Sequence, residues 1–191
     1  SNGLTSARHD GLGGNYREKY PETYAPETDP SLVYCGHYSL TDPLPGDDNF
    51  TVGQAILSPT RTYVPLIKKL FAAIPRSDVH GLVHCSGGGQ SKIVSFGGTA
   101  ERGNRYIKNN MLPVPPLFHV LKEATGQGWA EMYSVYNMGA RLEVILPENH
   151  AATCIDIARA CGIEAIVSGH VEAKDEPGNE VVISAEGGTH T

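Results

Sequence analysis

The sequence lacks the features on which several broad classes of protein depend. Its 191 residues carry 15 Lys and Arg against 21 Asp and Glu, and the basic residues form no block. Because nucleic-acid backbones are bound by clustered Lys and Arg, nucleic acid is a poor candidate partner. No apolar run approaches the roughly 20 residues that a membrane-spanning helix needs, and no secretory signal opens the chain. We therefore expect a cytoplasmic protein that binds neither membranes nor nucleic acids.

Cysteine is also scarce, and its spacing excludes the common cysteine-based sites. The sequence has 4 cysteines, and none belongs to a Cys-x-x-Cys pair. Cys154 and Cys161 fall in an expected helix, where a rise of about 1.5 Å per residue separates them by about 10 Å, too far for a disulfide. We expect these two to be small core residues in a reducing, cytoplasmic protein.

What is present is the composition of an ordinary globular domain, with 40% hydrophobic and 19% charged residues. The length predicts one domain over residues 1–191, and no internal repeat divides it. Apolar periodicity predicts helices over 4–8, 63–74, 115–124, 129–136 and 151–161, and strands over 79–85, 93–96, 106–108, 142–146, 163–171 and 181–184. A long loop rich in Pro and Asp, with a short strand at 32–34, is expected over 20–48. The pattern indicates an α+β fold built in layers.

The chemically most suggestive segment follows the expected strand at 79–85 and reads His84-Cys85-Ser86-Gly87-Gly88-Gly89-Gln90-Ser91-Lys92. Because glycine has no Cβ, three glycines let backbone N–H groups converge on an anion, and Lys92 adds a positive charge. A Gly-rich turn without a ligand explains the same pattern equally well, since such loops are weak signals.

Three kinds of chemistry compete for this segment. A cysteine phosphatase loop built on Cys85 would need Arg at position 91 to bind phosphate bidentately, and that position holds Ser91. A metal site would draw on His80, His84, Cys85 and His119, but no second ligand pair stands at metal-binding spacing. The third is a phosphate-bearing substrate held by the loop, with His84 at its root, and the rest of the chain favours it.

Several separated motifs resemble those of one family, the C-terminal domain of the AIR synthetases, or phosphoribosylformylglycinamidine cyclo-ligases. They occur in the family's order over almost the whole chain, and they are Ser1-Asn2-Gly3, Pro59-Thr60-Arg61-Thr62-Tyr63, the His-Cys-Ser-Gly-Gly-Gly run from His84, Pro115-Pro116-Leu117-Phe118, Glu131-Met132-Tyr133, Tyr136-Asn137-Met138-Gly139, and Gly169. Each motif alone is weak, but together they are specific. The resemblance implies a layered α/β/α domain with a mixed sheet.

The chain departs from the family pattern in several places. Cys85 and Ser86 replace an aliphatic residue and Thr, although Ser86 keeps the hydroxyl group. The Gln90-Ser91-Lys92 run differs from the common sequence, Tyr136 replaces Phe, and the segment 20–48 is longer than the compact common form. These differences indicate a divergent bacterial branch that keeps the same reaction.

The resemblance implies a ring closure in purine synthesis. ATP phosphorylates the formamide oxygen of formylglycinamidine ribonucleotide, and an amidine nitrogen then displaces phosphate to give aminoimidazole ribonucleotide. Such chemistry depends on positioning and charge stabilisation more than on a covalent nucleophile. His84 is the candidate for polarising the amide or moving a proton. The residues expected to hold the substrate are Asn2, Arg61, Ser86, Gly87, Gly88, Gly89 and Lys92, although Arg61 would serve equally well to cap a sheet edge.

The resemblance also implies a separate N-terminal domain that binds ATP and Mg²⁺ and forms a homodimer. Without that domain, the present chain is expected to be inactive. Sister enzymes of the same two-domain plan, such as selenophosphate synthetase and thiamine-monophosphate kinase, are alternatives, although the Pro-Thr-Arg and Asn-Met-Gly motifs favour the cyclo-ligase. A non-catalytic module that binds a phosphorylated ligand is a third interpretation.

Overall fold

The computed structural model describes residues 4–191 and has the mixed α and β content that the sequence predicts. The α-helices are α1 (Leu4–Gly11), α2 (Asn15–Lys19), α3 (Val52–Leu57), α4 (Val64–Ala73), α5 (Pro116–Thr125), α6 (Trp129–Val135) and α7 (Ala151–Arg159). The strands are β1 (Pro43–Leu44), β2 (Asp47–Thr51), β3 (Gly81–His84), β4 (Asn104–Lys108), β5 (Leu142–Ile145), β6 (Gly169–Ala173), β7 (Glu180–Ala185) and β8 (Gly188–His190). The 3-10 helices are η1 (Pro21–Thr23), η2 (Pro30–Leu32), η3 (Arg76–Asp78), η4 (Gly89–Ser95) and η5 (Glu148–His150). Within residues 4–191, every helix is too short or too polar to span a bilayer.

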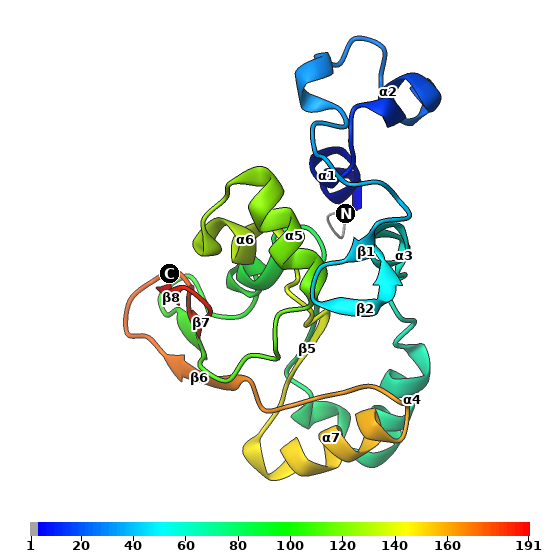
Figure 1. Cartoon of the computed structure of the whole chain (residues 1–191). Coiled ribbons are helices and arrows are strands. Elements are labelled where there is room, and N and C mark those ends of the chain that lie inside the picture. The colour runs from blue at the N-terminus through cyan, green and yellow to red at the C-terminus, as the bar shows by residue number, and fades with distance from the viewer. Residues whose placement is uncertain (1–3) are drawn as a thin grey trace.

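A two-stranded antiparallel ladder of β3 and β5 forms the middle layer (Figure 1). Leu82 pairs with Val144, and both pack beside Leu70 in the small core under α4 and α7, which lie side by side. Val83 pairs with Glu143 on the opposite face and joins the main core. Since neighbouring residues of a strand face opposite sides, helices cover the ladder on one face and the main core on the other. This arrangement confirms the layered α/β/α expectation.

The second sheet is mixed, with its four strands in the order β6-β4-β7-β8. β4 runs antiparallel to β6 and parallel to β7, and β7 turns back into β8. Tyr106 and Lys108 of β4 point with Val181 and Ile183 of β7 to the buried face. The side chain of Lys108 is thereby carried inside the protein.

The expected amphipathic helices form for the reason that their spacing suggests. In α4 and at its C-cap, Leu66, Leu70 and Ile74 stand four residues apart on one face, and all three are buried. Pro65 lies in the first turn, where a missing backbone N–H leaves no hydrogen bond broken. Pro116 opens α5 in the same way.

The segment 20–48 is mainly loop, as its composition predicts, and it is packed against the rest of the protein. It folds back on α1 and α2, and it contains η1, η2 and β1 (Figure 1). Arg17 Nε and Nη2 donate to the Val33 carbonyl at 3.0 and 2.8 Å, and Gly13 N–H donates to the Tyr38 carbonyl at 3.0 Å. The strand expected at 32–34 is wrong, because Pro30 starts a 3-10 turn that ends at Leu32.

Two further expectations about strands need correction. Residues 93–96 form no strand: 93–95 belong to η4 and Phe96 caps it, because Gly88 and Gly89 take left-handed backbone that turns the chain, and Ile93 packs into the main core. The strand expected over 163–171 begins only at Gly169. Gly169 pairs with Lys108, the last residue of β4, and beyond this pair the Ser168 carbonyl accepts from the N–H groups of both Asn109 and Asn110, so the regular ladder does not continue.

The β7–β8 turn is held by the one tryptophan of the chain. A Cβ added to Gly187 would lie 2.6 Å from Cγ of Trp129, whereas nothing lies within 4 Å of a Cβ added to Gly188. Both glycines have positive φ, +80° and +111°, so alanine is strained at either position. We expect Gly187→Ala to destabilise the protein by about 1–3 kcal/mol more than Gly188→Ala, because only the first displaces the indole. Urea unfolding followed by tryptophan fluorescence measures the difference; equal midpoints would contradict it.

Candidate functional site

The glycine loop, residues 86–89, begins where β3 leaves the ladder. Ser86 N–H donates to the His84 carbonyl at 2.8 Å, and Gly89 N–H donates to the Ser86 carbonyl at 3.1 Å. Gly88 and Gly89 have φ values of +89° and +51°, a backbone that L side chains rarely adopt. The loop therefore turns the chain sharply from β3 into η4 and leaves Gly87 and Gly88 exposed.

Lys92 reaches back to this loop from η4. Its Nζ donates to Ser86 Oγ at 3.1 Å, and Ser91 Oγ donates to the Gly88 carbonyl at 2.9 Å. The structure thus brings together the predicted Ser86, Gly87, Gly88 and Lys92 at one surface, whereas the predicted Gly89 is buried against the backbone at the end of α6. An ammonium group, a hydroxyl and uncovered backbone form a suitable environment for an anion; their role in binding stays a prediction.

His84 stands at the root of the loop with its side chain exposed. Its ring meets Tyr63 edge to face, with the ring centroids 6.2 Å apart. Burial raises the pKa of Tyr63, against the opposing charges of Arg141 and Arg61, so the phenol is neutral at pH 7. The imidazole of His84, a group that can carry a proton, is therefore exposed to solvent beside the ring of Tyr63.

Arg61 points elsewhere. Its guanidinium donates to the Gly162 carbonyl, just beyond α7, at 2.7 Å, while Arg141 donates to the Pro59 carbonyl at 2.8 Å. These two bonds fix the Pro-Thr-Arg segment on both sides. The hydrogen bond of Arg61 is therefore a structural one, to the turn that follows α7. The predicted residue Asn2 lies outside the described residues.

Cys85 is built into the core rather than activated. Its side chain is buried, and burial together with the charge of Glu143 raises the pKa of the thiol to about 12. A nucleophilic cysteine needs the opposite, an accessible thiolate of lowered pKa. The cysteine phosphatase interpretation is therefore excluded by the environment of Cys85 as well as by Ser91.

The histidines considered for a metal site are distributed over different elements. His119 lies on α5 against Trp129, 5.4 Å between ring centroids, and within 3.7 Å of Glu186. Across residues 4–191, no three His, Cys, Asp or Glu side chains gather as a metal-ion site requires.

The sequence that forms these elements matches a family model. Residues 31–182 match the family described as AIR synthase related protein, C-terminal domain. This chain belongs to that family. The match covers β3, the glycine loop, η4 and the turn at 137–140, and so includes the described parts of the candidate site.

Three similar curated proteins are named phosphoribosylformylglycinamidine cyclo-ligase. The protein of Methanosarcina barkeri is 33% identical over 146 residues, which cover 75% of this chain and 40% of that protein. The Symbiobacterium thermophilum protein is 31% identical over 151 residues, 78% of this chain and 41% of its own. The Burkholderia cenocepacia protein is 33% identical over 137 residues, 70% and 37% respectively. The chain thus spans about 40% of the length of the curated relatives that it matches.

Three polar residues that form one cluster were not singled out from the sequence: the buried Gln90 and Lys108, and the partly buried Glu143. Gln90 and Lys108 are 0% and 4% exposed, and the Glu143 side chain is 13% exposed. The sequence did contain a signal for the burial of Lys108. In the expected strand it stands two residues after Tyr106, and alternate residues of a strand point to the same face. Glu143 has no comparable signal, because a Glu between two apolar residues of a strand has the same sequence pattern whether it faces solvent or the interior.

Tyr136 stands where the family motif has Phe, and its extra hydroxyl has a partner. Tyr136 is 1% exposed, and its hydroxyl lies 2.6 Å from Ser6 Oγ. Ser6 Oγ donates to a carboxylate oxygen of Asp10. Since the Ser6 proton is directed at Asp10, Tyr136 is the donor to Ser6. The hydrogen-bonded row formed by Tyr136, Ser6 and Asp10 thereby connects the end of α6 to α1.

We expect Tyr136→Phe to cost about 1 kcal/mol of stability, the usual net value of one internal hydrogen bond. Tyr24→Phe is the matched control, because the Tyr24 hydroxyl makes only a long bond of 3.3 Å to the Arg17 carbonyl. Urea unfolding of both variants beside the parent chain measures the effect. If Tyr136→Phe unfolds at the parent's midpoint, the row contributes nothing to stability.

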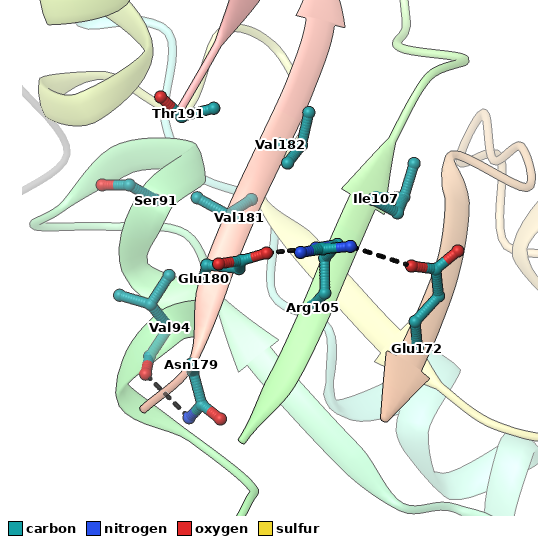
Figure 2. A pocket seen from close by; sticks show the side chains of 10 residues that line it. All are labelled: Ser91, Val94, Arg105, Ile107, Glu172, Asn179, Glu180, Val181, Val182 and Thr191. Carbon is teal, nitrogen blue, oxygen red and sulfur yellow. Dashed lines mark hydrogen bonds and ion pairs between the residues drawn. The ribbon is translucent and has the colours of Figure 1, made fainter. Parts of the chain in front are cut away.

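A separate pocket of about 720 Å³ lies against β4 and β7, and Ser91 and Val94 of η4 also line it (Figure 2). Arg105 is its one lining cation, paired with Glu180 and 3.7 Å from Glu172. Asn179 closes one end by donating to the Val94 carbonyl at 2.9 Å. Because two carboxylates already neutralise Arg105, these walls suit an anion less well than the surface formed by Ser86 and Lys92.

Proposed function

We propose that this chain is the substrate-holding C-terminal part of an ATP-dependent cyclo-ligase, which closes formylglycinamidine ribonucleotide to aminoimidazole ribonucleotide in purine synthesis. Membership of the AIR synthase related family and the names of the similar curated proteins support the reaction. The observation that carries it in this chain is the exposed glycine loop, with Lys92 Nζ 3.1 Å from Ser86 Oγ and His84 at its root.

The roles proposed for the residues follow from their positions. Ser86 Oγ, Lys92 and the exposed backbone at Gly87 and Gly88 bind the phosphate of the substrate, because they offer a hydroxyl, a cation and backbone N–H groups. His84, exposed beside Tyr63, polarises the formamide or carries a proton between the reacting nitrogen and solvent. When bound, ATP supplies the phosphoryl group that leaves as phosphate once the amidine nitrogen has attacked.

The nucleotide, its metal and the subunit partner belong to the same proposal. The chain spans about 40% of the length of its relatives, and we assign ATP and Mg²⁺ mainly to an N-terminal ATP-binding domain of the full-length protein. We propose that the full-length protein works as a homodimer in the cytoplasm.

The reaction is tested with the intact gene product. It is incubated with ATP, Mg²⁺ and formylglycinamidine ribonucleotide, and both aminoimidazole ribonucleotide and ADP are assayed. ATP-dependent formation of both supports the proposal, whereas ADP formed only with another acceptor indicates a sister enzyme such as selenophosphate synthetase or thiamine-monophosphate kinase. No turnover at all favours a phosphoryl-ligand binding module. The 191-residue chain serves as the control and should form no product.

Binding is tested on the present chain itself. Ribose 5-phosphate is titrated into ¹⁵N-labelled protein, with ribose as the matched ligand lacking phosphate. The proposal expects the amide signals of residues 86–92 to shift with the phosphate ester and not with ribose. Shifts confined to the pocket beside Arg105, or equal shifts with ribose, would contradict the assigned site.

A further inference from the structure

A buried polar cluster lies directly beneath the glycine loop. It consists of Gln90 at the start of η4, Lys108 at the end of β4 and Glu143 in β5. Its members come from three separate elements, and Gln90 and Lys108 are almost completely shielded from solvent. Charged residues are rarely buried unless they are paired, so this arrangement calls for an explanation.

Lys108 is the centre of the cluster and uses its ammonium donors inside the protein. Its Nζ donates to the Gln90 carbonyl at 2.6 Å, to Gln90 Oε1 at 3.1 Å and to Oε1 of Glu143. An ammonium group has three N–H donors, so these three acceptors satisfy it completely. The other oxygen of Glu143 is buried with no hydrogen-bond partner, so Lys108 is the cation that compensates this carboxylate.

Gln90 extends the cluster to the turn that carries the Asn-Met-Gly motif. Its Nε2 donates to the Asn137 carbonyl and to the Ala140 carbonyl, the latter at 2.8 Å. At the other end of the loop, Cys85 N–H donates to the Arg141 carbonyl at 2.8 Å. The glycine loop is therefore fastened at its entry and its exit to one segment, residues 137–143.

Burying this ion pair is a poor way to gain stability. Well-packed apolar residues of similar volume usually match or exceed a buried pair, because desolvation offsets the attraction between the charges. Hydrogen bonds, unlike apolar contacts, are directional, so they can fix the orientation of a backbone group. The cluster fixes the backbone at Gln90, the residue that follows the three glycines, and preorganised backbone groups bind a ligand without an ordering cost.

We propose that Lys108 is a positioning residue: through Gln90 and Glu143 it holds the glycine loop in the form that receives the phosphate of the substrate. The phosphate ligand rests on the proposed function above, but the ordering of the loop does not. The two parts are therefore tested by separate measurements on the present chain.

The first measurement is amide hydrogen exchange over residues 86–92. The test variant is Lys108→Met with Glu143→Leu, which removes both charges together and leaves no buried carboxylate unpaired. The matched control is Lys174→Met, which removes a lysine just after β6 that is bonded at 3.0 Å to Glu180 of β7, away from the loop. Lys108→Arg, which keeps the charge, should restore part of the protection.

Loop exchange should rise about tenfold or more in the double variant, while the core helices keep their protection, because lost directional bonds open the loop locally. The control should exchange like the parent chain. Unchanged loop exchange in the double variant overturns the proposal, as does a rise of equal size in every element, which would indicate a merely structural role. If the double variant fails to fold, Gln90→Met replaces it, since it frees the loop exit and keeps the ion pair; unchanged loop exchange there also overturns the proposal.

The second measurement adds ribose 5-phosphate. If the double variant binds ribose 5-phosphate more weakly than the parent chain while Lys174→Met binds it equally well, both parts of the proposal are supported. If the parent chain does not bind ribose 5-phosphate but the loop still loses protection in the variants, the proposed function fails and the ordering role stands. If the parent binds and the double variant binds equally well, the positioning role is overturned while the site remains.

Discussion

Replacing Gly89 by alanine is expected to be among the most damaging single changes to this chain. A Cβ at this position would lie 2.5 Å from the Tyr136 carbonyl oxygen and 2.6 Å from that of Tyr133, and both are backbone atoms at the end of α6. Backbone cannot rotate away as the tip of a side chain can. Gly89 therefore allows η4 to lie directly against α6.

The expected loss of stability has two parts. Alanine in left-handed backbone costs about 1–2 kcal/mol, and displacing two packed carbonyl groups adds about 1–3 kcal/mol. We therefore expect Gly89→Ala to lose roughly 2–5 kcal/mol in urea unfolding, a large fraction of the stability of a typical domain.

Gly88→Ala is the matched control for this prediction. Gly88 also has a positive φ, +89°, but an added Cβ would meet nothing nearer than Lys92 Cβ at 3.4 Å. It should pay only the backbone strain, about 1–2 kcal/mol. Equal losses for the two variants would show that the contact of η4 with α6 is softer than its geometry suggests.

Replacing His84 by alanine should reduce the turnover of the full-length enzyme by about 10²–10⁴-fold, the usual contribution of a positioned acid or base. The fold should survive, because the His84 side chain is exposed and its described ring contact is the edge-to-face one with Tyr63. The measurement is the rate of aminoimidazole ribonucleotide formation at saturating substrate, with the unfolding midpoint recorded for the same preparation.

The control is His80→Ala. His80 is also exposed and precedes β3, but it stands before the start of the ladder rather than at the root of the glycine loop. Its replacement should leave turnover within about twofold of the parent, as expected for a surface change away from the chemistry. Near-normal turnover of His84→Ala, or equal losses in both variants, would remove His84 from the proposed mechanism.

Much of the fold was predictable because local patterns and tertiary packing agree. Leu66, Leu70 and Ile74 mark the inner face of α4 in the sequence, and they are buried in the structure. The failures occurred where distant contacts outweigh local preference. Ile93 and its β-branched neighbour Val94 suggest a strand, but left-handed Gly88 and Gly89 start a 3-10 helix that packs on α6.

The candidate site divides along the same line. Ser86, the glycines and Lys92 lie within one short stretch of sequence, residues 86–92. A turn of the chain is enough to bring Lys92 to Ser86, so their contact was predictable. The sequence likewise determined the family, the layered class and His84 as a candidate. Only the tertiary structure decided that Lys108 and Glu143 meet beneath Gln90. The two residues belong to strands that are far apart in the chain. The burial of a charged side chain cannot be predicted until its partner is known, because burial depends on the pairing.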